Sequence, residues 1–515
     1  MADQLASFTE QIKNGYTFKG KSFKIGEAMC NKKAVPDCGV NLPLATLNRH
    51  GLICGATGTG KTKTLQLISE GLSDAGVPVL LMDIKGDLSG IAEPGVANDH
   101  VLQRSKLIGV DYSPTGYPVE LLSLSKQPGV RLRATVSEFG PVLLSKMLGL
   151  NDTQEGLLAM LFKFCDDHQL PLLDLKDLKE VLKYAAGPGK EQLEKLYGHI
   201  STTSTGTILR NVIALEQQDA DIFFGEKSFE VADLMRTASD GRGMVSIVRL
   251  TDIQDRPKLF SSFMLSLLSE LYATLPEVGD SGQPKLVMFI DEAHLIFQEA
   301  GDALLQKIET IIKLIRSKGV GIFFCTQNPT DIPAPVLSQL GLKVQHALRA
   351  FTAKDRKAIK QTAENYPISV YYKTDEIITQ LGIGEALITL LNEKGIPTPL
   401  VHTLLCAPRS RMDILQDAEI SALIAKSQLI AKYNGAIDEQ SAYEILTGKL
   451  QDADQSNQTE AKQPPSKPAT TAKEAPSMFS EFLHSSVARQ IGRTAGSIIV
   501  RSLLGTMGLG GRRRR

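Results

Sequence analysis

The sequence predicts an α/β fold with a mainly parallel sheet, a helical insertion and a helical tail. Three observations lead to this class. A glycine-rich loop lies between a short apolar segment and an amphipathic one, further apolar runs recur along the chain, and helix-like patterns separate these runs. Strands that alternate with helices form parallel sheets, because each crossover helix returns the chain to the same edge of the sheet.

The glycine-rich loop fits the phosphate-binding pattern G-x-x-x-x-G-K-[ST] at every fixed position. Its glycines let backbone N–H groups point at phosphate oxygens, and the following helix adds the positive end of its dipole. The lysine would reach the β- and γ-phosphates of ATP, and the threonine hydroxyl would join the Mg²⁺ shell. The loop consists of Gly55, Ala56, Thr57, Gly58, Thr59, Gly60, Lys61 and Thr62.

The segments on either side of this loop agree with a nucleotide site. Residues 50–54 have the apolar composition of a short buried strand, and residues 63–68 open an apolar-periodic helix. Strand, loop and helix in this order form the setting that the motif needs. We therefore disfavour the alternative of a glycine-rich turn that binds nothing.

Buried strands are predicted wherever a short apolar run is bounded by turn residues. Each is too short for a helix of ordinary length. The runs after the loop are Val77–Met82, Met244–Leu250, Lys285–Ile290, Val320–Cys325 and Ala386–Leu391.

Hydrolysis needs acidic residues beside the loop, and the run that ends at Ile290 supplies two. Asp291 follows it directly and is predicted to hold Mg²⁺, with Glu292 as the general base that polarises the attacking water. The alternative, two exposed acids at a strand end, is disfavoured because Lys61 stands upstream. His294 completes a D-E-A-H string and is interpreted as a supporting residue.

Polar residues at two other strand ends are further candidates. Gln327 follows the run Val320–Cys325 and is predicted to sense the γ-phosphate or the attacking water, whereas Asn328 is better explained as a helix cap or turn residue. Asp83 leaves two alternatives open, which are contact with Mg²⁺ and capping of residues 85–87.

Phosphoryl transfer also requires a cation that neutralises the developing charge, and a ring-shaped ATPase often takes it from a neighbouring subunit. Arg49, Arg316 and Arg349 lie near the relevant segments. From the residues alone, each could equally be an ordinary surface arginine.

Composition bounds the remaining choices. The formal net charge is zero, so no global charge favours nucleic acid, although residues 301–360 and 476–515 each carry a net charge of +6. No apolar run is long enough for a membrane span, the first twenty residues lack a signal-peptide core, and the six cysteines show no paired spacing. These features predict a cytoplasmic protein.

Domain boundaries follow from shifts in composition. Residues 112–241 are rich in Leu and Lys with helical patterning, and residues 451–476 have too few apolar side chains to fold. The predicted organisation is a lead-in at 1–48, a core at 49–111 and 242–410, a helical insertion at 112–241, a helical cap at 411–450, a linker at 451–476 and a Gly/Arg-rich helical tail at 477–515.

Taken together, the motifs resemble the HerA/FtsK branch of additional-strand P-loop ATPases, and bacterial HerA-like proteins of the YjgR type in particular. The segments that carry the likeness are residues 49–62, 290–294, 316–321 and 326–329. The resemblance implies a RecA-like core, ATP and Mg²⁺ at the interfaces of a homo-hexamer, and translocation of double-stranded DNA. It also implies that Arg49 acts in trans and Arg316 in cis.

One departure from the family separates the competing functions. About fifty residues precede the loop, too few for the N-terminal β-barrel through which HerA engages a nuclease, so a nuclease partner is not expected. The leading hypothesis is a DNA-translocating, helicase-like ATPase. The alternatives are a motor for protein remodelling or secretion, supported by the zero net charge, and a regulatory nucleotide-binding module, which Glu292 argues against.

Overall fold

The computed structural model describes residues 2–226, 228–253, 256–279, 281–298, 302–435 and 441–447. Its contacts divide the chain into two compact units. One is built from Met1–Leu132 with Phe229–Gly435, and the other from Arg133–Ser228 with the residues that follow Gly435. The linker predicted over 451–476 and the tail predicted over 477–515 lie outside the described residues.

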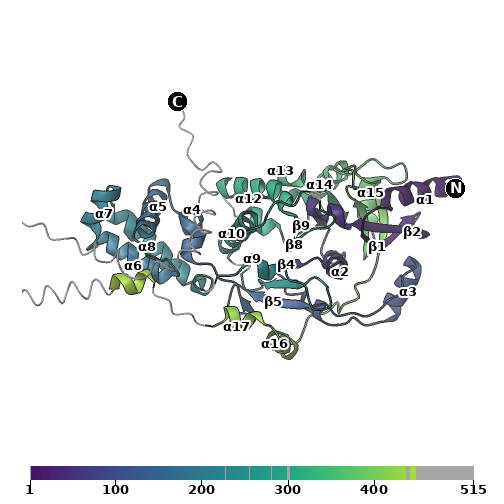
Figure 1. Ribbon diagram of the computed structural model, residues 1–515. Helices are drawn as coiled ribbons and strands as arrows, with labels where there is room; N and C mark the ends of the chain where they lie inside the picture. Colours follow the sequence, from purple (N-terminus) through teal and green to yellow (C-terminus); the bar gives the residue numbers. More distant parts are fainter. Residues whose placement is uncertain are drawn as a thin grey trace, which may run out of the picture. The chain divides into compact units, whose positions relative to one another are not determined.

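A single mixed sheet forms the centre of the first unit (Figure 1). In the described residues it has twelve strands in the order β2-β1-β12-β11-β10-β3-β9-β8-β4-β7-β5-β6. The strands are β1 Ser22–Cys30, β2 Lys33–Pro43, β3 Gly51–Cys54, β4 Val79–Asp83, β5 Val119–Ser123, β6 Val130–Arg131, β7 Val245–Arg249, β8 Leu286–Ile290, β9 Val320–Thr326, β10 Leu342–Gln345, β11 Glu385–Thr389 and β12 Val401–Leu405.

The parallel part of the sheet runs from β10 to β6 and confirms the predicted mainly parallel α/β core. All six predicted strands are present, as β3, β4, β7, β8, β9 and β11. Strand β9 lies between β3 and β8, and β4 follows β8 on the other side. Because these four strands are parallel, their carboxyl ends meet at one edge of the sheet.

The antiparallel part corrects the prediction of a simple lead-in over residues 1–48. Strands β1 and β2 pair with each other, and β1 continues the sheet through β12. The apolar run of β1 is interrupted by Gly26 and Glu27, so its period is hard to recognise. The Glu27 carboxylate is nevertheless buried, because Lys24 and the backbone N–H of Cys38 contact it at 2.6 and 2.5 Å.

The predicted insertion also begins too early at residue 112. Strands β5 and β6 lie inside the range 112–241, yet they belong to the main sheet, where β5 pairs with β7. Strand β5 has the sequence Val-Glu-Leu-Leu-Ser, and its glutamate interrupts the apolar run that would otherwise predict a buried strand. That glutamate, Glu120, is buried against Arg236 at 2.9 Å.

Helices cover both faces of the sheet. Buried residues of α1, α2 and α16 join one apolar core with the strands, whereas α12 contacts β9 and α10, and α11 contacts α10. The helices of this unit are α1 Ala2–Tyr16, α2 Lys61–Asp74, α3 Asp99–Ile108, α9 Val231–Leu234, α10 Pro257–Thr274, α11 His294–Gln298, α12 Asp302–Ile315, α13 Ala334–Leu337, α14 Ala353–Glu364, α15 Thr374–Gln380, α16 Asp417–Ala425 and α17 Leu429–Tyr433.

The second unit is helical. Three of its helices begin at capping boxes, in which a side chain and a backbone N–H three residues apart bond reciprocally. The polar residues 202–206 form the first turn of a helix capped by Ser201. The helices are α4 Val136–Leu148, α5 Asp152–Asp167, α6 Leu175–Ala186, α7 Lys190–Tyr197 and α8 Thr202–Glu216.

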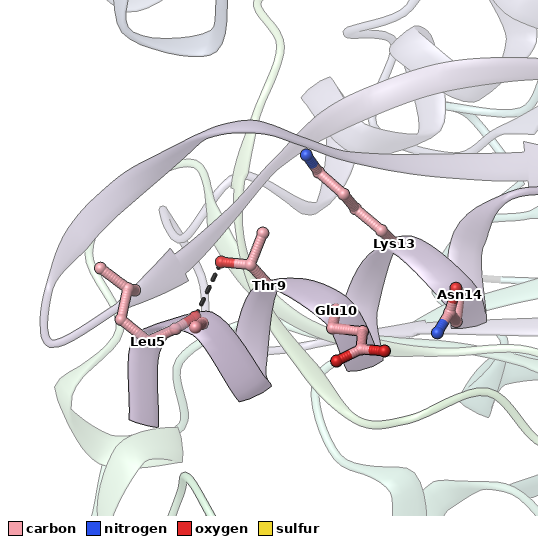
Figure 2. A pocket seen from close by; sticks show the side chains of 6 residues that line it. Leu5, Thr9, Glu10, Lys13 and Asn14 are labelled. Atoms are coloured by element: carbon pink, nitrogen blue, oxygen red, sulfur yellow. Dashed lines mark hydrogen bonds between the residues drawn. The ribbon is translucent and has the colours of Figure 1, made fainter. Parts of the chain in front are cut away.

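Helix α1 buries one face and leaves the other in solvent. Phe8, Ile12 and Tyr16 are fully buried in the sheet core, as their spacing of four residues requires. A shallow depression lies over the exposed face, beside Leu5 and Thr9 (Figure 2). Its lining comes from α1 alone, so it contains no group of the predicted nucleotide site. Among the described helices, none combines the length and apolar character that a membrane crossing requires.

Candidate active site

The predicted phosphate-binding loop joins the carboxyl end of β3 to the first turn of α2. Gly58 and Gly60 have φ angles of +76° and +113°, which only glycine adopts without strain. Gly60 is the N-cap of α2, so the free N–H groups of that helix open onto the loop. The local backbone therefore has the form that cradles phosphate.

Three backbone hydrogen bonds hold the loop from outside. The N–H of Ala56 donates to Ala347 O at 2.8 Å, and the N–H of Gly384 donates to Thr59 O at 3.2 Å. The N–H of Gly55 donates to Thr326 O at 3.3 Å. The loop is thus fixed by β9, by the residues after β10 and by the turn before β11.

Lys61 lies within this loop and is 6% exposed. Its ammonium donates to Gly55 O at 2.7 Å and to Ala56 O at 3.1 Å. Burial, followed by repulsion from Lys85, lowers the Lys61 pKa. Thr62 is the next residue of α2 and is half-buried. Both side chains belong to the helix turn that faces the loop, as the motif predicts.

The predicted acidic pair lies directly after β8, at the same edge of the sheet. Asp291 and Glu292 are 4% and 7% exposed, and their Oδ2 and Oε2 atoms have no hydrogen-bond partner. Burial raises the Asp291 pKa. Buried carboxylate oxygens without donors suit a cation, so Asp291 with Thr62 fits Mg²⁺. The described ranges contain no cluster of three or more His, Cys, Asp or Glu that could hold a metal ion.

Glu292 is constrained by backbone and by side chains. Its φ of +46° is unusual for a residue with a side chain and costs about 1 kcal/mol or more. The N–H of Ala293 donates to Cys325 O at 3.0 Å and fixes this turn against β9. Lys85 Nζ lies 2.5 Å from Oε1, and His294 Nδ1 lies 3.2 Å from Oε2 outside hydrogen-bonding geometry.

The structure decides between the two alternatives for Asp83. Its carboxylate accepts hydrogen bonds from the N–H groups of Gly86, Asp87 and Leu88 at 2.7, 3.2 and 3.2 Å. Burial, then repulsion from Asp87, raises the Asp83 pKa to about 7 despite these donors. Asp83 therefore caps the loop after β4, and that loop carries Lys85 to the acidic pair.

Gln327 and Asn328 follow β9, between the strands that carry the loop and the acidic pair. Gln327 is exposed at this edge, where a γ-phosphate sensor would lie. Asn328 is the N-cap of a short 3₁₀ helix, Pro329–Asp331, and its N–H donates to Asp331 Oδ2 at 3.1 Å. The capping interpretation of Asn328 is confirmed.

Arg49 and Arg316 lie at the opposite edge of the sheet. Arg49 precedes β3, and Arg316 precedes β9 in the 3₁₀ turn Arg316–Lys318. Strand β9 has seven residues, about 20 Å of extended chain, so the structure does not bring Arg316 to Lys61 of its own subunit. This placement argues against the action in cis that the family resemblance implies for Arg316. Both arginines flank His50, which is buried and whose pKa Arg316 helps to lower.

His346 is a site residue that the sequence did not reveal. It is buried beneath the phosphate loop, where a side chain on Gly55 would meet its Cβ at 2.5 Å. Its Nε2 lies 2.8 Å from Thr64 Oγ1 and its Nδ1 2.9 Å from Glu385 O. Its only signal in the sequence is its place after β10, a strand of four residues that is too short to show a clear apolar pattern.

These histidines predict a loss of stability in mild acid. Burial lowers the pKa of both His50 and His346 from 6.5 to about 4. The folded chain therefore binds fewer protons than the unfolded chain below pH 6.5, and each histidine removes about 3 kcal/mol by pH 4. The melting temperature should fall as pH drops from 6.5 to 4.

Comparison of variants isolates the histidines from carboxylates that also titrate in acid. His50→Gln should flatten the pH dependence of the melting temperature, whereas His100→Gln, at an exposed site, should leave it unchanged. If His50→Gln and the native chain lose the same number of degrees between pH 6.5 and 4.5, His50 does not stay neutral in the folded state.

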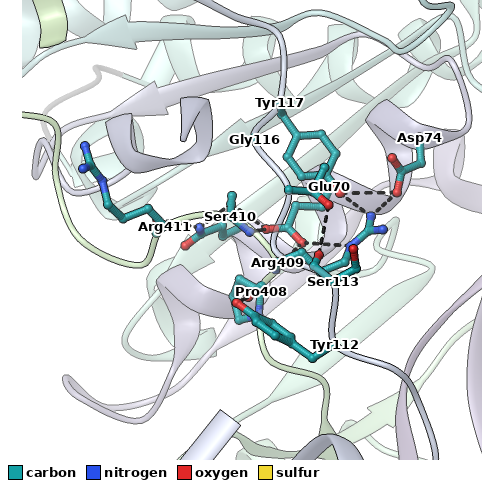
Figure 3. Close-up of polar contacts among 12 residues, drawn as sticks. Glu70, Asp74, Tyr112, Ser113, Gly116, Tyr117, Pro408, Arg409, Ser410 and Arg411 are labelled. Carbon is teal, nitrogen blue, oxygen red and sulfur yellow. Dashed lines mark hydrogen bonds and ion pairs between the residues drawn. The ribbon is translucent and has the colours of Figure 1, made fainter. Parts of the chain in front are cut away.

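The far half of α2 is fastened to the chain segment after β12 (Figure 3). The buried carboxylate of Glu70 accepts from the N–H groups of Arg409 and Ser410 at 2.9 and 3.0 Å, and from Ser410 Oγ at 2.6 Å. The Arg409 guanidinium contacts Asp74 and Tyr117. A shift of the phosphate-loop helix would therefore move this segment with it.

Comparison with known proteins finds relatives at low identity. "DNA import protein CedB" of Sulfolobus acidocaldarius is 23% identical over 402 residues, which cover 77% of this chain and 58% of CedB. "DNA double-strand break repair helicase HerA" of Saccharolobus solfataricus is 24% identical over 387 residues, which cover 74% of this chain and 68% of HerA. The chain thus spans little more than half the length of CedB.

A solved structure shows the same fold. The unbound monoclinic form of the bacterial conjugative coupling protein TrwBdeltaN70 matches with a TM-score of 0.51 at 14% identity, over 79% of this chain and 95% of that one. A family model described as "Helicase HerA-like C-terminal" matches residues 29–515. This chain therefore belongs to the family described as "Helicase HerA-like C-terminal".

Proposed function

We propose that this chain hydrolyses ATP with Mg²⁺ as a ring-forming motor that translocates double-stranded DNA. The observation that carries the proposal is the meeting, at one edge of the sheet, of a glycine loop with a buried lysine and an acidic pair in which Asp291 Oδ2 and Glu292 Oε2 accept no hydrogen bond. Lys61 would bind phosphate, Asp291 with Thr62 would hold Mg²⁺, and Glu292 would take the proton of the attacking water.

The placement of the arginines supports assembly into a ring. Arg49 and Arg316 lie at the edge of the sheet where β3 and β9 begin, whereas Lys61 follows the end of β3. A head-to-tail contact between copies would set one copy's arginines against the next copy's nucleotide, and such contacts form a ring when the rotation between copies closes. A homo-hexamer is the ring size that the family resemblance implies.

The relatives and a basic helix support DNA as the polymer. The two curated relatives are named for DNA import and for DNA break repair. In this chain, α14 carries four exposed basic side chains, Lys354, Arg356, Lys357 and Lys360. Cations on one exposed helix contact phosphates without reading sequence, which suits a translocating motor.

The test is ATP turnover with and without double-stranded DNA, at 50 and 200 mM salt. A protein that neutralises about four phosphates loses roughly 100-fold in DNA affinity over this range. DNA should therefore stimulate turnover strongly at low salt and weakly at high salt. Replacing the four basic residues of α14 with alanine should abolish the stimulation and preserve the basal rate.

A matched control uses four exposed lysines away from α14, namely Lys19, Lys21, Lys32 and Lys33, also changed to alanine. This variant should keep the stimulation. If the native chain hydrolyses ATP at a rate that DNA does not alter, and shows no salt-dependent DNA binding, the polymer is not DNA. The zero net charge of the chain would then favour the motor for protein remodelling or secretion.

A further inference from the structure

Lys85 places a second ammonium in the proposed site. Its Nζ lies 2.5 Å from Glu292 Oε1 and 3.7 Å from Asp291 Oδ2. Burial lowers the pKa of Lys85, but attraction to Asp291 and Glu292 outweighs it and leaves the pKa raised. Lys85 is therefore charged at neutral pH and paired with the general base that we assign.

The loop that carries Lys85 is rigidly built. The three hydrogen bonds to Asp83 fix its backbone directly after β4. Gly86 has a φ of +77°, and a side chain there would lie 2.7 Å from Thr251 Cγ2. The backbone is therefore held on both sides of Lys85, and this fixes the direction in which its side chain extends toward the acidic pair after β8.

The pairing makes the two oxygens of Glu292 unequal. Oε1 is occupied by the Lys85 ammonium, whereas Oε2 is buried and accepts no hydrogen bond. A free glutamate side chain samples several rotamers, and fixing one oxygen removes most of that freedom. The same contact leaves Oε2, which lies 3.2 Å from His294 Nδ1 without a hydrogen bond to it, as the atom available to a water molecule.

We propose that Lys85 is the positioning residue for the general base, holding Glu292 through Oε1 so that Oε2 receives the proton of the attacking water. This inference rests on the proposed ATP hydrolysis. In that step the water oxygen bonds to the γ-phosphorus, the bond from that phosphorus to the bridging oxygen of ADP breaks, and the water proton passes to Oε2. Lys85 itself gains and loses no atoms.

A different role for Lys85 would be direct binding of a phosphate, as for Lys61. The two ammonium groups interact, since Lys85 helps to lower the Lys61 pKa. The two roles differ in what they predict. A phosphate ligand contributes to nucleotide affinity, whereas a positioning residue contributes to the rate once nucleotide is bound.

The experiment compares Lys85→Met, which keeps the length and loses the charge, with Lys85→Arg and the native chain. Lys85→Met should lower kcat about 100-fold, the effect expected when a reacting group is misplaced by about 1 Å. The dissociation constant of a fluorescent ATP analogue should stay within about threefold of the native value. Lys85→Arg should recover much of the rate, because it restores a cation near Oε1.

The control is Lys343→Met, which removes another half-buried lysine. Its ammonium donates to Asn365 O at 3.0 Å, away from the acidic pair. This variant should keep both kcat and analogue affinity. A native chain without ATP turnover would refute the proposed function itself, whereas native turnover with an unchanged kcat in Lys85→Met would refute only the role of Lys85.

A second readout needs no turnover. In the nucleotide-free protein, Lys85→Met should lower the melting temperature, and this shift should shrink in a Glu292→Gln background, because the paired carboxylate is already gone. Equal shifts in both backgrounds would show that Lys85 and Glu292 do not interact. More than a tenfold loss of analogue affinity in Lys85→Met, with kcat preserved, would make Lys85 a phosphate ligand and overturn the proposal.

Discussion

Glu292→Gln is expected to abolish ATP turnover while the chain still binds nucleotide. Glutamine has the shape of glutamate but cannot accept the proton of the attacking water, and loss of a general base costs about 10²- to 10⁴-fold in rate. Glu292 as a whole residue is 7% exposed, so bulk water cannot easily replace its carboxylate as the proton acceptor. Phosphate release measured in the steady state would report the loss.

Binding of a fluorescent ATP analogue provides the complementary measurement. Because glutamine keeps the shape of glutamate and Glu292 is assigned to the water and not to the phosphates, the analogue should bind Glu292→Gln as tightly as the native chain. Glu277→Gln, at a largely exposed position, is the matched control and should hydrolyse ATP normally. Turnover within tenfold of the native rate in Glu292→Gln would mean that another group activates the water.

The second large effect is expected at the arginines. Arg49→Ala and Arg316→Ala should each lower turnover by about 10³- to 10⁵-fold if these side chains neutralise charge on transferring phosphate. Neither side chain lies at the edge of the sheet that carries Lys61 of the same subunit. Each variant should therefore retain analogue binding and lose hydrolysis.

Mixing inactive variants tests whether the arginines act between subunits. Lys61→Ala disables a subunit's own loop but keeps its arginines, whereas Arg49→Ala does the reverse. In rings of random composition, about a quarter of the interfaces would combine an intact loop with an intact arginine. Activity should therefore reappear on mixing. If the mixture stays inactive although mass measurements show mixed assemblies, Arg49 does not act across an interface.

The parallel core could be predicted because its strands are buried on both faces. Runs such as Leu286–Ile290 are apolar throughout, and the acidic pair stands directly after one of them. Strands β1 and β5 could not be predicted, because each contains a buried glutamate. Glu27 is buried in β1 through its ion pair with Lys24, and Glu120 in β5 through its ion pair with Arg236. Arg236 lies far from Glu120 along the chain, so no local pattern reveals that the two residues pair.

The same reason limits what the sequence says about the site. The geometry of the loop Gly55 to Thr62 could be predicted, because it depends only on residues that are neighbours along the chain. Lys85 and His346 depend on which strands become neighbours, and that is a property of the sheet order. Arg316 depends on strand direction, which places it at the far edge even though it lies only 24 residues after Glu292 along the chain.

The sheet order has a consequence for synthesis of the chain. Strand β3 pairs with β9 and β10, and both follow the helical unit by roughly 100 residues. At a translation rate of about 5 to 20 residues per second, the apolar strand that bears the phosphate loop waits roughly 15 to 55 seconds for its first neighbour. During that interval β3 is an apolar segment without its sheet neighbours and is prone to aggregation. A chaperone that shields early apolar segments would therefore raise the yield of the folded protein.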